Sequence, residues 1–214
     1  MSDADAVVRA VADGHLAILP TDTVYGLACT AFGRQPAVDL YRLKGRSEIQ
    51  PTALVAASIE ALLECLPELR DGAEWQVRAL LPGPFTLVVA NPARRFTWLS
   101  QGKPDTIGVR VPALVGAAAD VLERLRAIVA TSANLPGGQD PRRLEEVPAE
   151  ILAGVAATLD GGELPGTPST VIDLTGPDPI VLREGAGDPA AAFHRVAAHT
   201  QSLPLDDGAL TREG

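Results

Sequence analysis

Residues 16–27 read LAILPTDTVYGL, and this stretch decides the fold. The apolar run 16–19 predicts a buried strand that Pro20 terminates. Two threonines and an aspartate follow at the strand exit, which is where ligand sites of open α/β sheets lie. A simple turn with a helix N-cap is the alternative interpretation of the same polar residues. We therefore expect a sheet whose site begins just after Pro20.

The next helical pattern, 37–43, leads directly to Lys44 and Arg46. Of the 18 lysines and arginines in the chain, only Lys44 and Lys103 are lysines. A lysine at this position indicates a need for a compact, strongly hydrated charge rather than a planar guanidinium. A hydroxyl-rich strand end beside a cation pair suits a small polar substrate next to a phosphate.

The rest of the chain alternates strand and helix patterns and then carries strands in quick succession. This order predicts an α/β fold with a twisted mixed β-sheet and flanking helices. We expect one domain over 1–200 and a flexible C-terminal tail over 201–214. The predicted helices are 4–12, 37–43, 59–66, 73–81, 114–125 and 189–199, and the predicted strands are 16–19, 53–57, 85–90, 106–111, 127–130, 155–159, 170–174 and 180–183.

Composition and charge limit the function. The 214 residues are 46% hydrophobic and 21% charged, which is ordinary for a globular protein. No apolar run is long enough to cross a membrane, and the acidic start lacks the basic region of a signal peptide, so we expect a cytoplasmic protein. The formal net charge of −9 predicts weak or no direct binding of nucleic acid.

Several common chemistries are excluded by their motifs. The chain has no P-loop, no GxGxxG after a strand and no GxSxG elbow. His15, His194 and His199 lack zinc-binding spacing, and Cys29 and Cys65 are expected to be reduced core thiols. We expect no protein metal site, and a reaction that depends on positioning and charge stabilisation.

Six ordered segments resemble the YrdC-like threonylcarbamoyl-adenylate synthase family, in its short form with a single synthase domain. Each segment is short, but together they span most of the chain in the family's order. The segments are PTDTVYGL with KGR (20–27 and 44–46), PGPFT (82–86), TIGVRVP (106–112), TSAN (131–134), STVID (169–173) and VLREG (181–185).

The resemblance implies a YrdC-like fold with a concave substrate cleft. The implied reaction is that of a nucleotidyltransferase, which forms threonylcarbamoyl-AMP and pyrophosphate from L-threonine, bicarbonate and ATP with Mg²⁺. The implied role is the first step of the tRNA modification t6A, upstream of a tRNA threonylcarbamoyl transferase complex. The alternative is a YrdC-fold RNA- or nucleotide-binding protein without adenylate synthase activity.

The resemblance also implies roles for particular residues. Lys44 and Arg46 would be catalytic. Threonine would be bound by Thr23, Arg110, Ser132 and Ser169, and ATP by Arg46, Gln50, Thr106, Asn134, Arg142 and Arg183.

Simpler interpretations stay open for some of these residues. Ser132 and Asn134 could build a turn, Ser169 could only begin a strand, and Arg110 could face solvent from an alternating strand. Two positions also depart from the family pattern. Ser47 stands where many members have proline, and Gln50 where many have Asn, Ser or Lys. Both lie in the loop that would bind the nucleotide.

Overall fold

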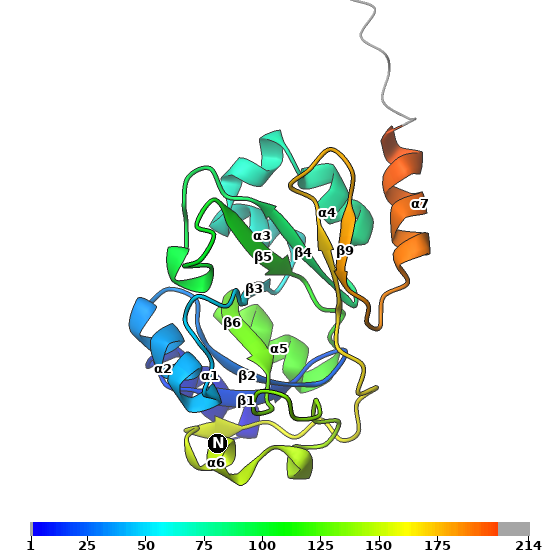
Figure 1. Cartoon of the computed structure of the whole chain (residues 1–214). Coiled ribbons are helices and arrows are strands. Elements are labelled where there is room, and N and C mark those ends of the chain that lie inside the picture. The colour runs from blue at the N-terminus through cyan, green and yellow to red at the C-terminus, as the bar shows by residue number, and fades with distance from the viewer. Residues whose placement is uncertain (1, 201–214) are drawn as a thin grey trace, which may run out of the picture.

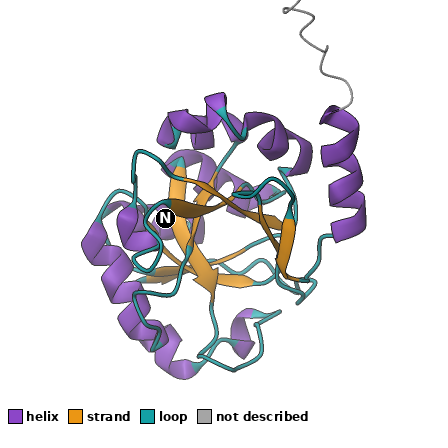
Figure 2. Ribbon diagram, turned by 45° about the horizontal axis from the view of Figure 1, so that its top comes forward, coloured by secondary structure: helices purple, strands orange, loops and turns teal. Residues whose placement is uncertain are grey.

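A computed structural model describes residues 2–200, so the predicted tail, 201–214, lies outside the described residues. Strands run through the middle of the molecule and helices surround them (Figures 1 and 2). The predicted α/β architecture, a twisted mixed sheet with flanking helices, is confirmed.

Nine strands form one sheet in the order β7-β1-β2-β6-β3-β5-β4-β8-β9. Neighbours are parallel in the pairs β1–β7, β3–β5 and β4–β8, and antiparallel in the other five. The strands are β1 (Ala17–Pro20), β2 (Tyr25–Thr30), β3 (Ala53–Ala56), β4 (Phe85–Ala90), β5 (Thr106–Arg110), β6 (Ala127–Ser132), β7 (Ala157–Thr158), β8 (Thr170–Asp173) and β9 (Ile180–Arg183).

The helices begin and end close to the positions that the sequence predicts. α1, for example, begins with a capping box, in which the Ser2 hydroxyl accepts from the Asp5 N–H and the Asp5 carboxylate accepts from the Ser2 N–H. The helices are α1 (Asp3–Ala12), α2 (Arg34–Lys44), α3 (Ile59–Cys65), α4 (Glu74–Leu80), α5 (Gly116–Leu125), α6 (Ala149–Ala153) and α7 (Pro189–Thr200), with short 3₁₀ turns at Pro67–Asp71, Thr97–Leu99 and Leu144–Glu146.

One face of the sheet is covered by α2, α3 and α4. Its strand residues are large and fully buried, as Leu54, Leu87, Val109 and Ile172 on four adjacent strands show. Because these side chains lie on one face, they alternate along each strand with residues of the opposite face. This face holds the larger hydrophobic core.

The opposite face is covered only in part. The paired helices α1 and α5 pack on Ala17, Val55 and Ile128. Further along the same face the strand residues become small or polar, and Ala53 and Ala130 are partly exposed. The uncovered part of this face, beyond α1 and α5, is where most of the predicted site residues lie.

Besides the three 3₁₀ turns, two elements were not predicted from the sequence. The first is β2, which pairs antiparallel with both β1 and β6, and the second is the short helix α6. In β2, Gly26, Ala28 and Cys29 have small side chains that give a weak strand pattern, so pairing on both sides decides the conformation. Pro20 is the last residue of β1 rather than a residue beyond it.

Candidate active site

A buried ion pair links the β1–β2 turn to the end of β5. Arg110 Nη2 donates to Asp22 Oδ1 and also, at 2.8 Å, to Thr23 Oγ1. Both charged side chains are only about one-tenth exposed, at 11% and 10%. The alternative of a solvent-facing Arg110 is therefore wrong. We call Asp22, Thr23 and Arg110 the paired end of the site.

The hydroxyl of Thr23 has a defined polarity. Thr21 Oγ1 donates to the Val24 carbonyl at 2.7 Å, which uses its only proton. In the 3.0 Å contact between the two threonine hydroxyls, Thr23 is therefore the donor. Since Thr23 Oγ1 donates to Thr21 and accepts from Arg110, it retains one acceptor position. The residue is fully buried.

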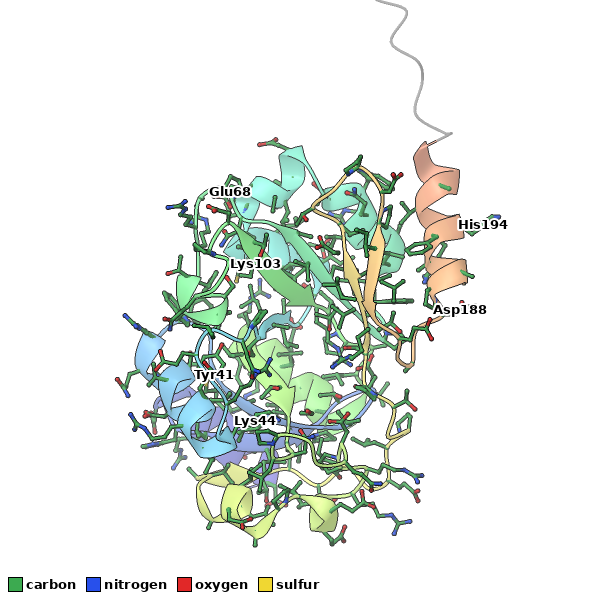
Figure 3. The ribbon with its side chains drawn as sticks, viewed as in Figure 1. Tyr41, Lys44, Glu68, Lys103, Asp188 and His194 are labelled. Atoms are coloured by element: carbon green, nitrogen blue, oxygen red, sulfur yellow. The ribbon has the colours of Figure 1, made fainter. Side chains whose placement is uncertain are left out.

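Lys44 is the last residue of α2, and Gly45 turns the chain sharply after it. Gly45 has φ = 65°, in the left-handed region, with Gly45 N–H donating to Arg42 and Arg46 N–H to Tyr41. This is a Schellman-type helix end, which favours glycine. The turn places Lys44 (labelled in Figure 3) next to the exit of β6, where Arg46 also donates to Thr131.

The Lys44 ammonium is buried among neutral oxygens. Its Nζ donates to the carbonyl of Ser132 at 2.5 Å, to the carbonyl of Asn134 at 2.7 Å and to Asn134 Oδ1 at 2.8 Å. These three bonds use all three of its protons. Burial, helped by the positive charge of Arg46, lowers the pKa of Lys44 to about 8.

Arg46 and Arg183 are also held by neutral groups. Arg46 donates to Gln50 Oε1 at 3.1 Å, to Thr131 Oγ1 at 3.1 Å and to the Pro51 carbonyl at 2.7 Å. Arg183 donates to the Ser169 carbonyl at 3.1 and 2.8 Å and to its hydroxyl at 3.2 Å. Burial lowers the pKa of both guanidinium groups.

Lys44, Arg46 and Arg183, which we call the cation cluster, have no carboxylate partner among the described residues. Their positive charges repel one another. As a result, Arg46 lowers the pKa of Lys44, and Arg183 lowers the pKa of Arg46. Asp140 acts in the opposite direction on Lys44 and Arg183. The cluster therefore keeps an excess of positive charge.

The predicted serines and asparagine bind the members of the cation cluster and one another. Ser132 Oγ donates to Asn134 Oδ1 at 2.6 Å, and Asn134 Nδ2 donates to the Gly138 carbonyl at 2.7 Å. Ser169 Oγ lies 2.8 Å from Thr86 Oγ1. Ser132 and Asn134 do build a turn, and that turn is also the anchor of Lys44.

Two of the predicted nucleotide residues lie less centrally. Thr106 begins β5, four residues before Arg110, and its hydroxyl donates to the Lys103 carbonyl at 3.1 Å. Its strand pairs with β3, which begins two residues after Pro51, the residue whose carbonyl Arg46 contacts. Arg142 is half exposed and forms an ion pair with Glu163, so the structure does not bring its guanidinium into the cation cluster.

Three residues of the site were not assigned from the sequence. Asp22 lies inside the quoted PTDT motif, where its position between two threonines could have indicated a role. Thr86 belongs to the PGPFT segment, and Asp140 to the Gly/Pro-rich loop after Asn134. Asp22 and Thr86 contact partners that are 83 or more residues away in the sequence, so no local sequence signal reveals these contacts.

Other expected features are placed as follows. His15 is exposed and His194 projects outward from α7, whereas the side chain of His199 is outside the described set (Figure 3).

Within residues 2–200 no helix is long and apolar enough to cross a membrane, and no group of three or more His, Cys, Asp or Glu is arranged to hold a metal. Cavities of about 480 and 230 Å³ lie elsewhere, so the concave cleft stays a prediction.

Comparison with known proteins identifies relatives. A family model named Sua5/YciO/YrdC and described as "Telomere recombination" matches residues 9–185. A Pyrococcus abyssi protein named threonylcarbamoyl-AMP synthase is 33% identical over 91% of this chain, and the match spans 57% of that relative's length.

Two solved structures are similar over most of the chain. Pyrococcus abyssi Sua5 in complex with L-threonine superposes with a TM-score of 0.82 at 29% identity, covering 96% of this chain and 63% of that one. Escherichia coli YciO superposes with a TM-score of 0.75 at 28% identity, covering 88% of this chain and 91% of that one. The chain thus matches about nine-tenths of a short relative and about three-fifths of a longer one.

Proposed function

Since the chain belongs to the Sua5/YciO/YrdC family, we propose that it is an L-threonylcarbamoyladenylate synthase. The reaction joins L-threonine, bicarbonate and ATP into threonylcarbamoyl-AMP and releases pyrophosphate. One observation carries the proposal: within residues 2–200 the cation cluster has no carboxylate partner, whereas Arg110, whose positive charge lowers the pKa of Arg183, is paired with one. The first arrangement suits phosphates, and the second suits a small zwitterion.

We propose that threonine binds at the paired end, with Ser132 and Ser169 at its border. The Nη1 group of Arg110, whose protons are not used by Asp22 or Thr23, would donate to the threonine carboxylate, since arginine prefers carboxylates. The free acceptor position of Thr23 would receive a substrate donor, either the hydroxyl or the amine. Ser132 would act in the same way, because its own proton is donated to Asn134.

The nucleotide would bind over the cation cluster. Arg46 and Arg183 would contact the phosphates, with Gln50, Thr106 and Asn134 around them. Arg142 would take part only if its ion pair with Glu163 opened. We propose that Mg²⁺ arrives with ATP, bound to phosphate oxygens, and that it neutralises part of the triphosphate charge.

The proposed chemistry needs no nucleophilic side chain. The threonine amine attacks the carbon of bicarbonate, and loss of water leaves a carbamate. A carbamate oxygen then attacks the α-phosphorus, the bond from that phosphorus to the bridging oxygen breaks, and pyrophosphate leaves with the electron pair. Negative charge spreads over the phosphoryl oxygens, so positioning and cations supply the catalysis.

We propose a cytoplasmic protein whose product passes to a separate tRNA threonylcarbamoyl transferase complex. The net charge of −9 opposes a polyanion, so direct tRNA binding would be weak and would compete with ATP for the cation cluster. The alternative, a nucleotide- or RNA-binding protein without synthase activity, is favoured by two facts. Ser47 replaces the family's proline, and Lys44 has all three protons bound to protein oxygens.

One assay tests the proposal. The full chain is incubated with ATP, Mg²⁺, L-threonine and bicarbonate, and pyrophosphate and threonylcarbamoyl-AMP are measured with each substrate omitted in turn. The synthase hypothesis expects release that requires all three substrates. Tight ATP binding without product would support the binding-protein alternative instead.

A further inference from the structure

We propose that Asp22 is the positioning residue for Arg110, and that it sets the affinity for the amino-acid substrate. This inference rests on the proposed function, since it concerns the end of the site to which threonine is assigned. Asp22 itself is not assigned to substrate contact. It would act through the guanidinium that it holds.

The first step of the argument is the geometry of the guanidinium. An arginine Nη2 has two protons, and those of Arg110 are donated to Asp22 and Thr23. Within residues 2–200, Arg110 Nε is buried without a partner, and Nη1 donates to no protein group. Nη1 is therefore the donor group left for a substrate, and Asp22 fixes the plane of the guanidinium in which it lies.

The second step is that Asp22 fixes the backbone as well as the side chain. Its Oδ2 accepts from the N–H of Ala113 at 3.0 Å. Ala113 follows Arg110 by three residues, just beyond the end of β5. One carboxylate thus anchors both the guanidinium and the chain segment from which it extends.

The third step is electrostatic. A buried arginine needs a counter-charge, because an unpaired charge away from water is costly. Asp22 supplies that charge before any substrate arrives, so Arg110 is held in one place rather than sampling several. Preorganised groups bind ligands more tightly because less ordering is needed on binding.

The experiment compares steady-state constants of the full chain for pyrophosphate release. The variants are Asp22→Asn, which keeps the shape but removes the charge, Arg110→Met, and the double variant. We expect Asp22→Asn to raise the KM for threonine at least about tenfold, with the KM for ATP changed less than about twofold. In the Arg110→Met background, Asp22→Asn should have no further effect on threonine, because its partner is gone.

Asp5→Asn is the matched control. It removes the half-exposed pair with Arg124 between α1 and α5, away from the site, and should leave both KM values unchanged. If Asp22→Asn does not fold, Asp22→Glu keeps the charge but displaces the guanidinium, and it should also raise only the threonine KM.

The outcomes separate two failures. A wild-type chain without threonine-dependent release refutes the proposed function, and the role of Asp22 with it. The positioning role is refuted if Asp22→Asn keeps the wild-type KM for threonine while Arg110→Met raises it strongly. The proposed function then still stands. An equal effect of Asp22→Asn with and without Arg110 also refutes it, because Asp22 would then act independently of Arg110.

Discussion

Arg110 and Arg183 each occupy the last position of a strand of the same sheet, but their guanidinium groups have different partners. Arg110 is paired with the Asp22 carboxylate. In the part of the chain that the structure describes, Arg183 donates only to the carbonyl and hydroxyl oxygens of Ser169, and Lys44 and Arg46 likewise bind neutral oxygens. The same charge is therefore neutralised at one end of the site and left in excess at the other.

This difference matches the charges of the two proposed substrates. A neutral carbonyl holds a cation in place without cancelling its charge, so the cation cluster can still attract a triphosphate. An amino acid zwitterion has no net charge, and a site that is neutral overall suits it. Four predictions test this comparison, beginning with the largest effect.

The largest effect is expected in the cation cluster. Arg46→Ala and Lys44→Ala should each reduce threonylcarbamoyl-AMP synthesis by on the order of a hundredfold or more, because each removes positive charge beside the reacting phosphates. Steady-state pyrophosphate release, with circular dichroism to check folding, measures this.

Arg42→Ala is the control for that pair of variants. Arg42 lies on α2 near Lys44, but its side chain is 74% exposed and paired with Asp39, so its loss should change synthesis little. Near-normal activity in folded Arg46→Ala and Lys44→Ala would remove the catalytic role of the cluster. The difference between the cation cluster and the paired end would then be a structural one without a role in catalysis.

The paired end should show a smaller effect, in substrate choice. We expect L-serine to have a kcat/KM tens of times lower than L-threonine, because one methyl group in a pocket contributes roughly 1–3 kcal/mol. Val171, partly buried on β8 beside Thr86, is the proposed apolar contact for that methyl group. Equal kcat/KM for the two amino acids would show that the methyl group is not recognised.

The sequence predicts the covered face of the sheet far better than the site. In β4 the span 85–90 is predicted to the residue, because its large apolar side chains alternate with smaller or more exposed ones. The same rule fails in β2, where small buried residues such as Ala28 and Cys29 give no alternating pattern and pairing with β1 and β6 decides the strand. The local sequence pattern therefore predicts strands that pack large side chains into the core. Strands without such side chains are determined by pairing with their neighbours in the sheet.

The site shows the same limit. Motifs single out Lys44, Arg46 and Arg110 because charged residues at strand and helix ends are conspicuous in a sequence. The ion pair of Arg110 spans 88 residues, and the acceptors of Lys44 are backbone carbonyls about as far away. The fold determines which of these cations has a carboxylate partner, and residue spacing in the sequence does not predict it.

A third prediction concerns pH and Lys44. Its pKa is lowered to about 8, mainly by burial, so the charged fraction falls about tenfold between pH 7 and pH 9. Phosphate binding favours the charged form, so the KM for ATP should rise by up to about tenfold over that range, and ATP binding near pH 8.5 should take up a proton. Calorimetry in two buffers of different ionisation enthalpy measures the uptake.

Stability should respond to pH in the opposite sense. The unfolded chain holds the Lys44 proton up to about pH 10.5, whereas the folded chain releases it near pH 8. The unfolded state therefore binds more protons in that window, and the Lys44 contribution to the free energy of unfolding increases with pH. The role of the Lys44 charge in ATP binding would be contradicted if the KM for ATP did not change with pH and equalled that of Lys44→Met.

The smallest effect is expected in the segment that joins the two ends. Residues 160–168 run from Tyr25 toward Ser169, and the Gly166 N–H donates to the Thr23 carbonyl at 2.9 Å. The Tyr25 hydroxyl anchors the start of this segment, 2.8 Å from Asp160 Oδ1 and 2.9 Å from both the Gly162 carbonyl and the Gly161 N–H. Burial raises the pKa of Tyr25 to about 12, so the hydroxyl stays protonated.

Tyr25→Phe removes that anchor and should lower the free energy of unfolding by about 1–2 kcal/mol in urea denaturation. Tyr41→Phe is the matched control, because the Tyr41 hydroxyl lies 3.4 Å from the Trp98 carbonyl, a distance at which little is lost. Amide exchange at Gly161 and Gly166 should accelerate in Tyr25→Phe, and the threonine KM should rise slightly. Faster exchange with both KM values unchanged would show that the paired end is held by Asp22 alone, since Thr23 would then need no support from the segment over it.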